Sequence, residues 1–271
     1  MRNLLRGDLS RLCRSKLLWL CMAAAFAVSV FFLLQMGAGN ENFRTLDESF
    51  LQVLPFLPIL FGVLIGLFLG EDYQDGTMRN KLIAGHTRAA VYLSLLLTAV
   101  AGSLAILLAW ALSAAVGVAQ FGWFTAPWQT LLLQAAVIVM MASAVAGILT
   151  LLSMLVTNRA VAAVASILAV FVLLLLGSYF YNALCEPEML SAATMTENGF
   201  EVGDPVPNPK YIGGTLRTVY GVLIHVLPSG QAVLLANQEL THPGLALCAS
   251  ACILLLTTGV GIAAFRRKDL K

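Results

Sequence analysis

One polar stretch, residues 70–88, reads Gly70-Glu71-Asp72-Tyr73-Gln74-Asp75-Gly76-Thr77-Met78-Arg79-Asn80-Lys81-Leu82-Ile83-Ala84-Gly85-His86-Thr87-Arg88, and it decides how the chain is arranged. It holds three acidic and three basic residues, and uncharged apolar runs flank it at residues 50–69 and 89–119. A run of about 20 apolar residues spans roughly 30 Å of hydrocarbon. Residues 70–88, called the polar loop below, are therefore predicted to connect two membrane spans at one face of the membrane.

The composition of the whole chain supports this interpretation. Of the 271 residues, 59% are hydrophobic and only 11% are charged, and the mean hydropathy is +0.87. Soluble domains carry about 25% charged residues. The sequence thus predicts an all-α integral membrane protein of one domain, residues 1–271, with six transmembrane helices at about residues 17–36, 50–69, 89–119, 128–156, 160–181 and 244–265.

Two segments outside these spans have features of their own. In residues 1–16, leucines at positions 5, 9 and 12 recur at helical spacing and arginines lie toward the other side, which favours an amphipathic helix in the membrane interface. The apolar run that follows is longer than the 7–15 residues typical of a cleaved signal peptide, so it is interpreted as a span. Residues 182–243 form the largest polar segment and are predicted to be a small cap between the fifth and sixth helices, with one or two short helices.

The basic residues are distributed unevenly between the two faces. The face with both termini, the polar loop and Arg159 collects 13 of the 16 basic residues, whereas the other face has only Arg44, Lys210 and Arg217 beside nine acidic residues. Cytoplasmic loops of membrane proteins carry an excess of lysine and arginine. Both termini and the polar loop are therefore predicted to be cytoplasmic, and the cap to be extracellular.

The span before the polar loop contains Gly62, Gly66 and Gly70 at a spacing of four residues. Small residues at this spacing form one stripe on a helix and let a neighbouring helix approach closely. These three glycines are therefore predicted to serve helix packing.

The polar loop itself is predicted to contain a short helix from Gly76 to Ala84. Asp75 is the candidate N-cap and Gly85 is the candidate stop. We expect Met78, Leu82 and Ile83 to share one side of this helix and Arg79 and Lys81 to lie elsewhere on its surface. Such a helix can lie on lipid or press on a partner, and its sequence leaves both open.

Motifs for catalysis and nucleotide binding do not occur in the sequence. The chain contains no H-E-x-x-H, no G-x-S-x-G and no G-x-x-x-x-G-K-[ST], and its three histidines are scattered. We therefore predict no catalytic, cofactor-binding or metal-binding residues, and any ATP that drives the protein would bind to another chain. The spans also contain no charged residue, which favours a peptide, lipid-like or amphipathic cargo over a bare ion.

The polar loop also resembles a known family. Gly70-Glu71-Asp72-Tyr73 followed by Gly76-Thr77-Met78-Arg79-Asn80-Lys81-Leu82 is similar to the loop after the second helix in bacterial type-2 permeases of ATP-binding-cassette (ABC) exporters. The similarity covers nearly the whole chain, because it extends to Arg88-x-x-x-Tyr92-x-Ser94, Asn208-Pro209-Lys210-Tyr211-x-x-Gly214-Thr215, Leu227-Pro228-x-Gly230-Gln231 and the tail Phe265-Arg266-Arg267-Lys268-Asp269-Leu270-Lys271.

The resemblance implies partners and a contact region. In this family, two six-helix permeases pair in the cell membrane and carry cytoplasmic ATPases, and the loop after the second span is the coupling helix. The resemblance assigns Glu71, Asp72, Gly76, Thr77, Arg79, Asn80 and Lys81 to the ATPase contact, and Met78, Leu82 and Ile83 of the same predicted helix complete it. The implied partners are an ABC ATPase that holds ATP and magnesium, a second permease copy or paralogue, and membrane lipid, with no nucleic acid and no cofactor on this chain.

Two other functions remain open from the residues alone. The first is a non-transporting membrane protein, such as an immunity or sensor protein, that binds a peptide through residues 182–243. The second is a membrane-embedded enzyme, for which the chain offers no motif. The favoured hypothesis is the transmembrane subunit of an ABC exporter, with a cargo that the resemblance does not name.

Overall fold

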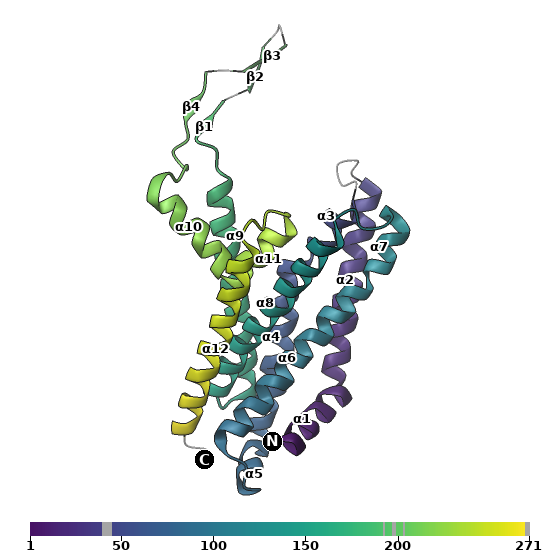
Figure 1. Ribbon diagram of the computed structural model, residues 1–271, viewed down its shortest axis with the longest axis vertical. Coiled ribbons are helices and arrows are strands. Elements are labelled where there is room, and N and C mark those ends of the chain that lie inside the picture. Colours follow the sequence, from purple (N-terminus) through teal and green to yellow (C-terminus); the bar gives the residue numbers. More distant parts are fainter. Residues whose placement is uncertain (40–44, 192, 197–198, 203, 269–271) are drawn as a thin grey trace.

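The computed structural model of the protein describes residues 1–39, 45–191, 193–196, 199–202 and 204–268. Six helical segments in it are long and apolar enough to cross a membrane, which confirms the predicted number of spans and the all-α class. These segments are Lys16–Met36, Leu46–Gln74, Arg88–Phe121, Trp128–Leu155, Arg159–Cys185 and Pro243–Arg267. They run side by side along the long axis of the molecule (Figure 1).

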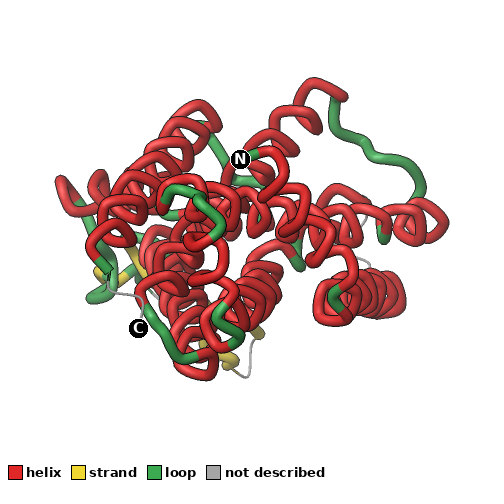
Figure 2. The backbone as a smooth tube through the Cα atoms, turned by 90° about the horizontal axis from the view of Figure 1, so that it is seen from below, coloured by secondary structure: helices red, strands yellow, loops and turns green. Residues whose placement is uncertain are grey.

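The helices and strands follow one another in an order that leaves one end of the bundle to the termini. They are α1 (Arg2–Arg14), α2 (Lys16–Gly39), α3 (Leu46–Leu51), η1 (Leu54–Phe56), α4 (Leu57–Gln74), α5 (Thr77–Ile83), α6 (Arg88–Leu112), α7 (Ala114–Phe121), α8 (Trp128–Leu155), α9 (Arg159–Cys185), β1 (Met189–Leu190), β2 (Ala193–Thr196), β3 (Gly199–Val202), β4 (Val206–Pro207), α10 (Gly214–Val226), α11 (Pro228–Ala236) and α12 (Pro243–Arg267). Figure 1 shows α1, α5 and the carboxyl end of α12 together at the bottom, called the terminal face here, and the strands at the top, at the opposite face. Figure 2 looks along the helices from the terminal face, with loops joining their ends.

The second span is longer than the predicted residues 50–69 and is not one straight helix. It begins earlier, at α3, passes through the short 3-10 helix η1 and continues as α4 to Gln74. Pro55 and Pro58 lie at this break, and a proline ring has no N–H to donate to the preceding turn. The start of the span is therefore irregular at residues 52–57.

The third apolar run is broken where one helix was expected over residues 89–119. α6 ends at Leu112 and α7 begins at Ala114, with Ser113 between them. The Ser113 hydroxyl donates to the Trp110 carbonyl oxygen at 2.7 Å and lies 2.6 Å from the Ser29 hydroxyl of α2. A serine that bonds back to the preceding turn competes with the helical hydrogen bonds and bends the helix.

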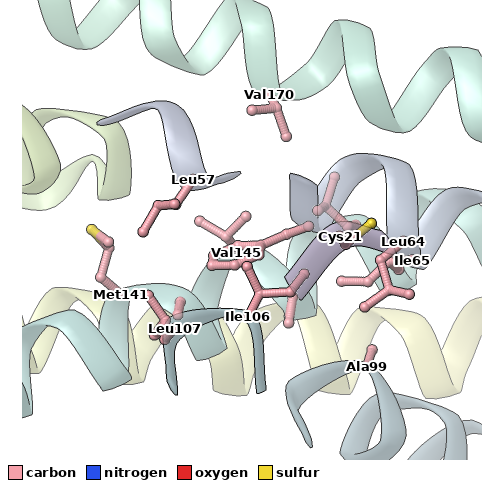
Figure 3. Close-up of a cluster of buried hydrophobic side chains, with 14 of the residues drawn as sticks. Cys21, Leu57, Leu64, Ile65, Ala99, Ile106, Leu107, Met141, Val145 and Val170 are labelled. Atoms are coloured by element: carbon pink, nitrogen blue, oxygen red, sulfur yellow. The ribbon is translucent and has the colours of Figure 1, made fainter. Parts of the chain in front are cut away.

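The central helix of the bundle is α4. In its span, 72% of the most apolar window is buried, more than in any of the other five. Figure 3 shows Leu64 and Ile65 of α4 near Ile106 of α6 and Val145 of α8 in one cluster of buried side chains. Any displacement of the end of α4 at the terminal face is therefore transmitted to a close-packed core.

The glycine stripe of α4 faces α9. A Cβ atom at Gly66 would lie 2.8 Å from the Ala163 Cα, and one at Gly70 would lie 2.9 Å from the Arg159 Cα. At Gly62 it would lie 3.2 Å from the Ser166 carbonyl oxygen. The two backbones approach so closely because these positions have no side chain.

Residues 182–243 are more varied than a small cap. α9 continues to Cys185, β1 pairs with β4, β2 pairs with β3, and α10 and α11 meet at an angle of 93°. Every residue of α11 is buried, and the helix lies against α8, α9 and α12. Gln231 of α11 is fully buried and donates to the carbonyl oxygens of His225 and Ala246. Part of the segment predicted to be a cap is thus packed into the bundle.

Candidate functional site

Ionic side chains from three helices and a hydroxyl from a fourth meet at the terminal face, directly behind the polar loop. They come from α1, α4, α5 and α6, which the chain brings together although they are far apart in sequence. This group, called the charge cluster, consists of Asp8, Arg11, Asp72, Thr77, Lys81 and Ser94.

Asp72 occupies the centre of the charge cluster at the carboxyl end of α4. Its side chain is completely buried and accepts hydrogen bonds from Arg11 Nη1, from Lys81 Nζ at 3.2 Å and from Thr77 Oγ1 at 2.7 Å. Arg11 also lies over the Phe68 ring, with its guanidinium carbon 4.3 Å from the ring centroid. Burial of a carboxylate is tolerated here because two cations and a hydroxyl compensate its charge.

A second buried carboxylate, Asp8 of α1, completes the cluster. It accepts from Lys81 Nζ at 2.8 Å and from Ser94 Oγ at 2.7 Å. The buried stripe of α1 is Leu4, Asp8 and Leu12, so it includes a charged residue and differs from the predicted apolar side of Leu5, Leu9 and Leu12. α1 therefore lies against α6, fixed in part by the hydrogen bond from Ser94 to Asp8, and its ion pairs join it to α4 and α5.

Lys81 is a member of this buried network, and its predicted position on the surface is wrong. Its side chain is 14% exposed, and its ammonium group bridges Asp8 and Asp72. Burial lowers the pKa of Lys81, and the hydrogen bond with Asp8 opposes this shift. A lysine placed between two carboxylates joins α5 to both α1 and α4.

The ends of α5 are determined by glycines. The helix starts at Thr77 with Gly76 as N-cap at φ 65°, and no side chain caps it, so the predicted cap at Asp75 is wrong. Asp75 instead ends α4, and its N–H donates to the Glu71 carbonyl oxygen at 2.9 Å. At the other end, Gly85 has φ 87°, its N–H donates to Leu82, and the His86 N–H donates to Lys81. This pair of bonds is the Schellman arrangement, in which glycine adopts the left-handed conformation after the last turn.

The residues predicted to contact an ATPase fall on two sides of α5. Met78 is 2% exposed, and Leu82 packs against the core. Ile83 was expected beside them, yet it is 74% exposed and lies with exposed Arg79 and Asn80 on the other side of the helix. Arg79, Asn80 and Ile83 are called the outer side of α5.

The rest of the polar loop is tied to neighbouring helices. Glu71 is partly exposed and forms an ion pair with Arg159 at 3.6 Å. Tyr73 donates from its hydroxyl to the Met154 carbonyl oxygen at 2.8 Å, and Lys268 donates to the same oxygen at 2.7 Å. Arg88 donates to the Phe265 carbonyl oxygen at 2.9 Å. The loop is thus attached to the ends of α8, α9 and α12.

Sequence reasoning missed Asp8, Arg11, Ser94 and Tyr73. Asp8 was detectable in principle, because it is the only acidic residue among residues 1–16. In the part of the chain that the structure describes, no group of three or more histidine, cysteine or acidic residues could hold a metal ion. The candidate site is thus α5, which the charge cluster holds on its inner side and which is exposed on its outer side.

Comparison with known proteins identifies a family for this arrangement. A family model described as ABC-2 family transporter protein matches residues 4–177. The match begins in α1 and ends in α9, so it contains every residue of the charge cluster and the whole polar loop. A comparison with curated proteins finds no match.

Proposed function

Because the chain belongs to the ABC-2 family of transporter proteins and is a multi-pass membrane permease subunit, we propose that it exports its cargo with energy from an ABC ATPase on a separate chain. The terminal face is then cytoplasmic, in a bacterial cell membrane, and ATP and magnesium bind to the partner. The observation that carries this proposal is the outer side of α5, exposed on a helix whose inner side is locked by the charge cluster.

The outer side of α5 has the composition of a small docking surface. Ile83 offers an apolar anchor, and Arg79 and Asn80 offer polar groups beside it. Interfaces commonly combine an apolar centre with a polar rim, and charged rim residues steer association. The inner side keeps this surface in place, because Lys81 and Thr77 are bound to Asp72. Of the ten residues predicted for the ATPase contact, Arg79, Asn80 and Ile83 are the ones we propose to touch it.

The same contacts offer a route from the ATPase to the membrane spans. A partner can bias two conformations only through contacts that differ between them. A push on α5 would reach Asp72 at the end of α4, and the glycine stripe would carry it to α9. In this proposal, α4 and α9 shift together because their backbones are in close contact.

A second permease copy or a paralogue is also part of the proposal. Only 28% of the apolar window of α9 and 17% of that of α12 is buried within the chain. These helices offer apolar surface to lipid and to a second subunit alike. The cargo that we propose is a peptide, a lipid-like molecule or another amphipathic compound, in keeping with the six apolar runs of the sequence, which contain no charged residue.

The test is assembly with the ATPase. In the variant with both Arg79→Glu and Ile83→Asp, we expect the amount of ATPase that co-purifies with the chain to fall at least about tenfold. The first substitution reverses a charge at the proposed interface, and the second removes its apolar anchor. Lys210→Glu is the matched control, since Lys210 is an exposed cation near the opposite face. Undiminished ATPase in the double variant, or an equal loss with Lys210→Glu, would contradict the proposal.

A further inference from the structure

A cavity of about 400 Å³ lies between α3, α6 and α8, next to the loop before α8. It is near the opposite face, far along the bundle from α5 (Figure 1). Its walls are leucine, isoleucine, valine, alanine and aromatic side chains together with the polar Gln134, and Asp47 is the only charged residue among the described residues that line it. The volume is in the range typical of small-molecule sites, about 300–1,000 Å³.

Asp47 has one carboxylate oxygen that accepts hydrogen bonds and one that has no partner among the described residues. The residue is 6% exposed, and its Oδ2 accepts from the Thr125 N–H at 2.7 Å and from the Thr125 hydroxyl at 2.6 Å. Its Oδ1 is buried and has no hydrogen-bond partner within the described part of the chain. A buried polar atom without a partner costs free energy, so a donor that reached Oδ1 from the cavity that Asp47 lines would be stabilised.

Three aromatic side chains line the cavity beside Asp47, and a ring face that is open to the cavity would attract a cation. Phe50 and Trp110 stack with ring centroids 4.3 Å apart, and the edge of Phe124 meets Phe50 at 6.0 Å. Aromatic faces attract ammonium groups, and the attraction grows when water is excluded. Trp110 Nε1 is also buried with no partner among the described residues, which adds one donor for an oxygen of the same ligand.

We propose that this cavity binds an organic ammonium ion with an apolar body. Its N–H donates to Asp47 Oδ1, and its apolar part lies along α6 and α8 in place of lipid or water. A carboxylate of similar shape is repelled by Asp47, and a neutral alcohol can donate its O–H to the carboxylate but forms no ion pair with it. That the bound ammonium compound is a cargo rests on the proposed function, whereas the binding itself does not.

The experiment measures binding of octylammonium to the full chain in nanodiscs of zwitterionic lipid, by calorimetry, with the heat of empty nanodiscs subtracted. We expect octylammonium to bind about tenfold to a hundredfold more tightly than octanol, as an ion pair with Asp47 permits, and octanoate to bind most weakly. Asp47→Asn should abolish the advantage of octylammonium over octanol. Equal affinities for the three probes, or an unchanged advantage in Asp47→Asn, would overturn the proposal.

Two further variants distinguish loss of the binding site from misfolding of the chain. Glu48→Gln is the matched control, because Glu48 is the neighbouring carboxylate on α3 and is exposed; it should bind as the unaltered chain does. Ala135→Phe places a ring in the cavity without touching Asp47 and should weaken octylammonium and octanol together; unchanged binding there would place the probes elsewhere and refute the site. If octylammonium binding fails while the ATPase still assembles with the chain, the cavity proposal is wrong and the proposed function is retained. If the ATPase does not assemble while octylammonium still binds, the proposed function is wrong and the site is retained.

Discussion

Asp72→Asn is expected to destabilise the protein by about 3 kcal/mol, because removal of a buried carboxylate leaves the mostly buried Lys81 and the partly exposed Arg11 with one negative charge fewer beside them. Asp72 is completely buried and faces both Arg11 and Lys81. In Asp72→Asn these cations keep Asp8 as their only buried carboxylate. The measurement is the free energy of unfolding of the purified chain in detergent, together with a fall of the melting temperature by roughly 6 °C or more.

The matched control for Asp72→Asn is a substitution of the neighbouring residue, Glu71. Glu71→Gln removes a carboxylate whose ion pair with Arg159 is partly exposed at 3.6 Å, and it should change stability by no more than about 1 kcal/mol. Adding Arg11→Met to Asp72→Asn should restore part of the loss, since Lys81 keeps its ion pair with Asp8 whereas Arg11 has lost the carboxylate that it bonds. Equal effects of the Asp72 and Glu71 variants would show that the charge cluster does not brace the terminal face.

Gly66→Leu is expected to separate α4 from α9 and to cost about 3 kcal/mol or more. Even a Cβ atom at this position would lie 2.8 Å from the Ala163 Cα, which is backbone and cannot turn aside. The free energy of unfolding measures the packing defect. If α4 and α9 transmit the ATPase cycle, ATP-dependent transport should also fall in whatever fraction of the variant remains folded.

Gly259→Leu is the control for this substitution. Gly259 is a helical glycine of α12 with nothing within 4 Å of the position that a Cβ atom would occupy. A leucine there has room and a better helix propensity than glycine, so stability should be retained. A Gly66→Leu protein as stable as Gly259→Leu would show that the glycine stripe does not hold the two helices together.

The parts of the fold that depend on local sequence could be predicted. Six spans follow from uncharged runs of sufficient length, and the stop of α5 at Gly85 follows from the conformational freedom of glycine. The start of α5 could not be predicted in the same way. Asp75 has the chemistry of an N-cap, but its backbone belongs to the end of α4, and Gly76 takes the position.

The charge cluster depends on contacts between distant residues, and here local reasoning failed. Arg11 and Asp72 are 61 residues apart, and Lys81 and Asp8 are 73 apart. Helical periodicity places charged side chains toward water, so it put Lys81 on the surface and Ile83 beside Met78. Buried ion pairs reverse this rule, because each charge is compensated by a partner that no single helix reveals.

The cavity at Asp47 was not predicted from the sequence, for a related reason. In the sequence, Asp47 and Glu48 are equivalent acids before an apolar run. Only the approach of Thr125 and Trp110 makes one of them a buried carboxylate at a cavity wall. The burial of α11 likewise depends on α8, α9 and α12, which contact it from elsewhere in the chain.

The central claim, that the outer side of α5 faces an ATPase, is tested most directly by photocrosslinking in native membranes. A photoreactive benzophenone side chain is placed at Ile83, at the buried Met78, or at Lys210 near the opposite face. We expect a crosslink between position 83 and the ATPase and none from positions 78 or 210. A complex that forms without a crosslink at position 83, or with one at position 210, would contradict it.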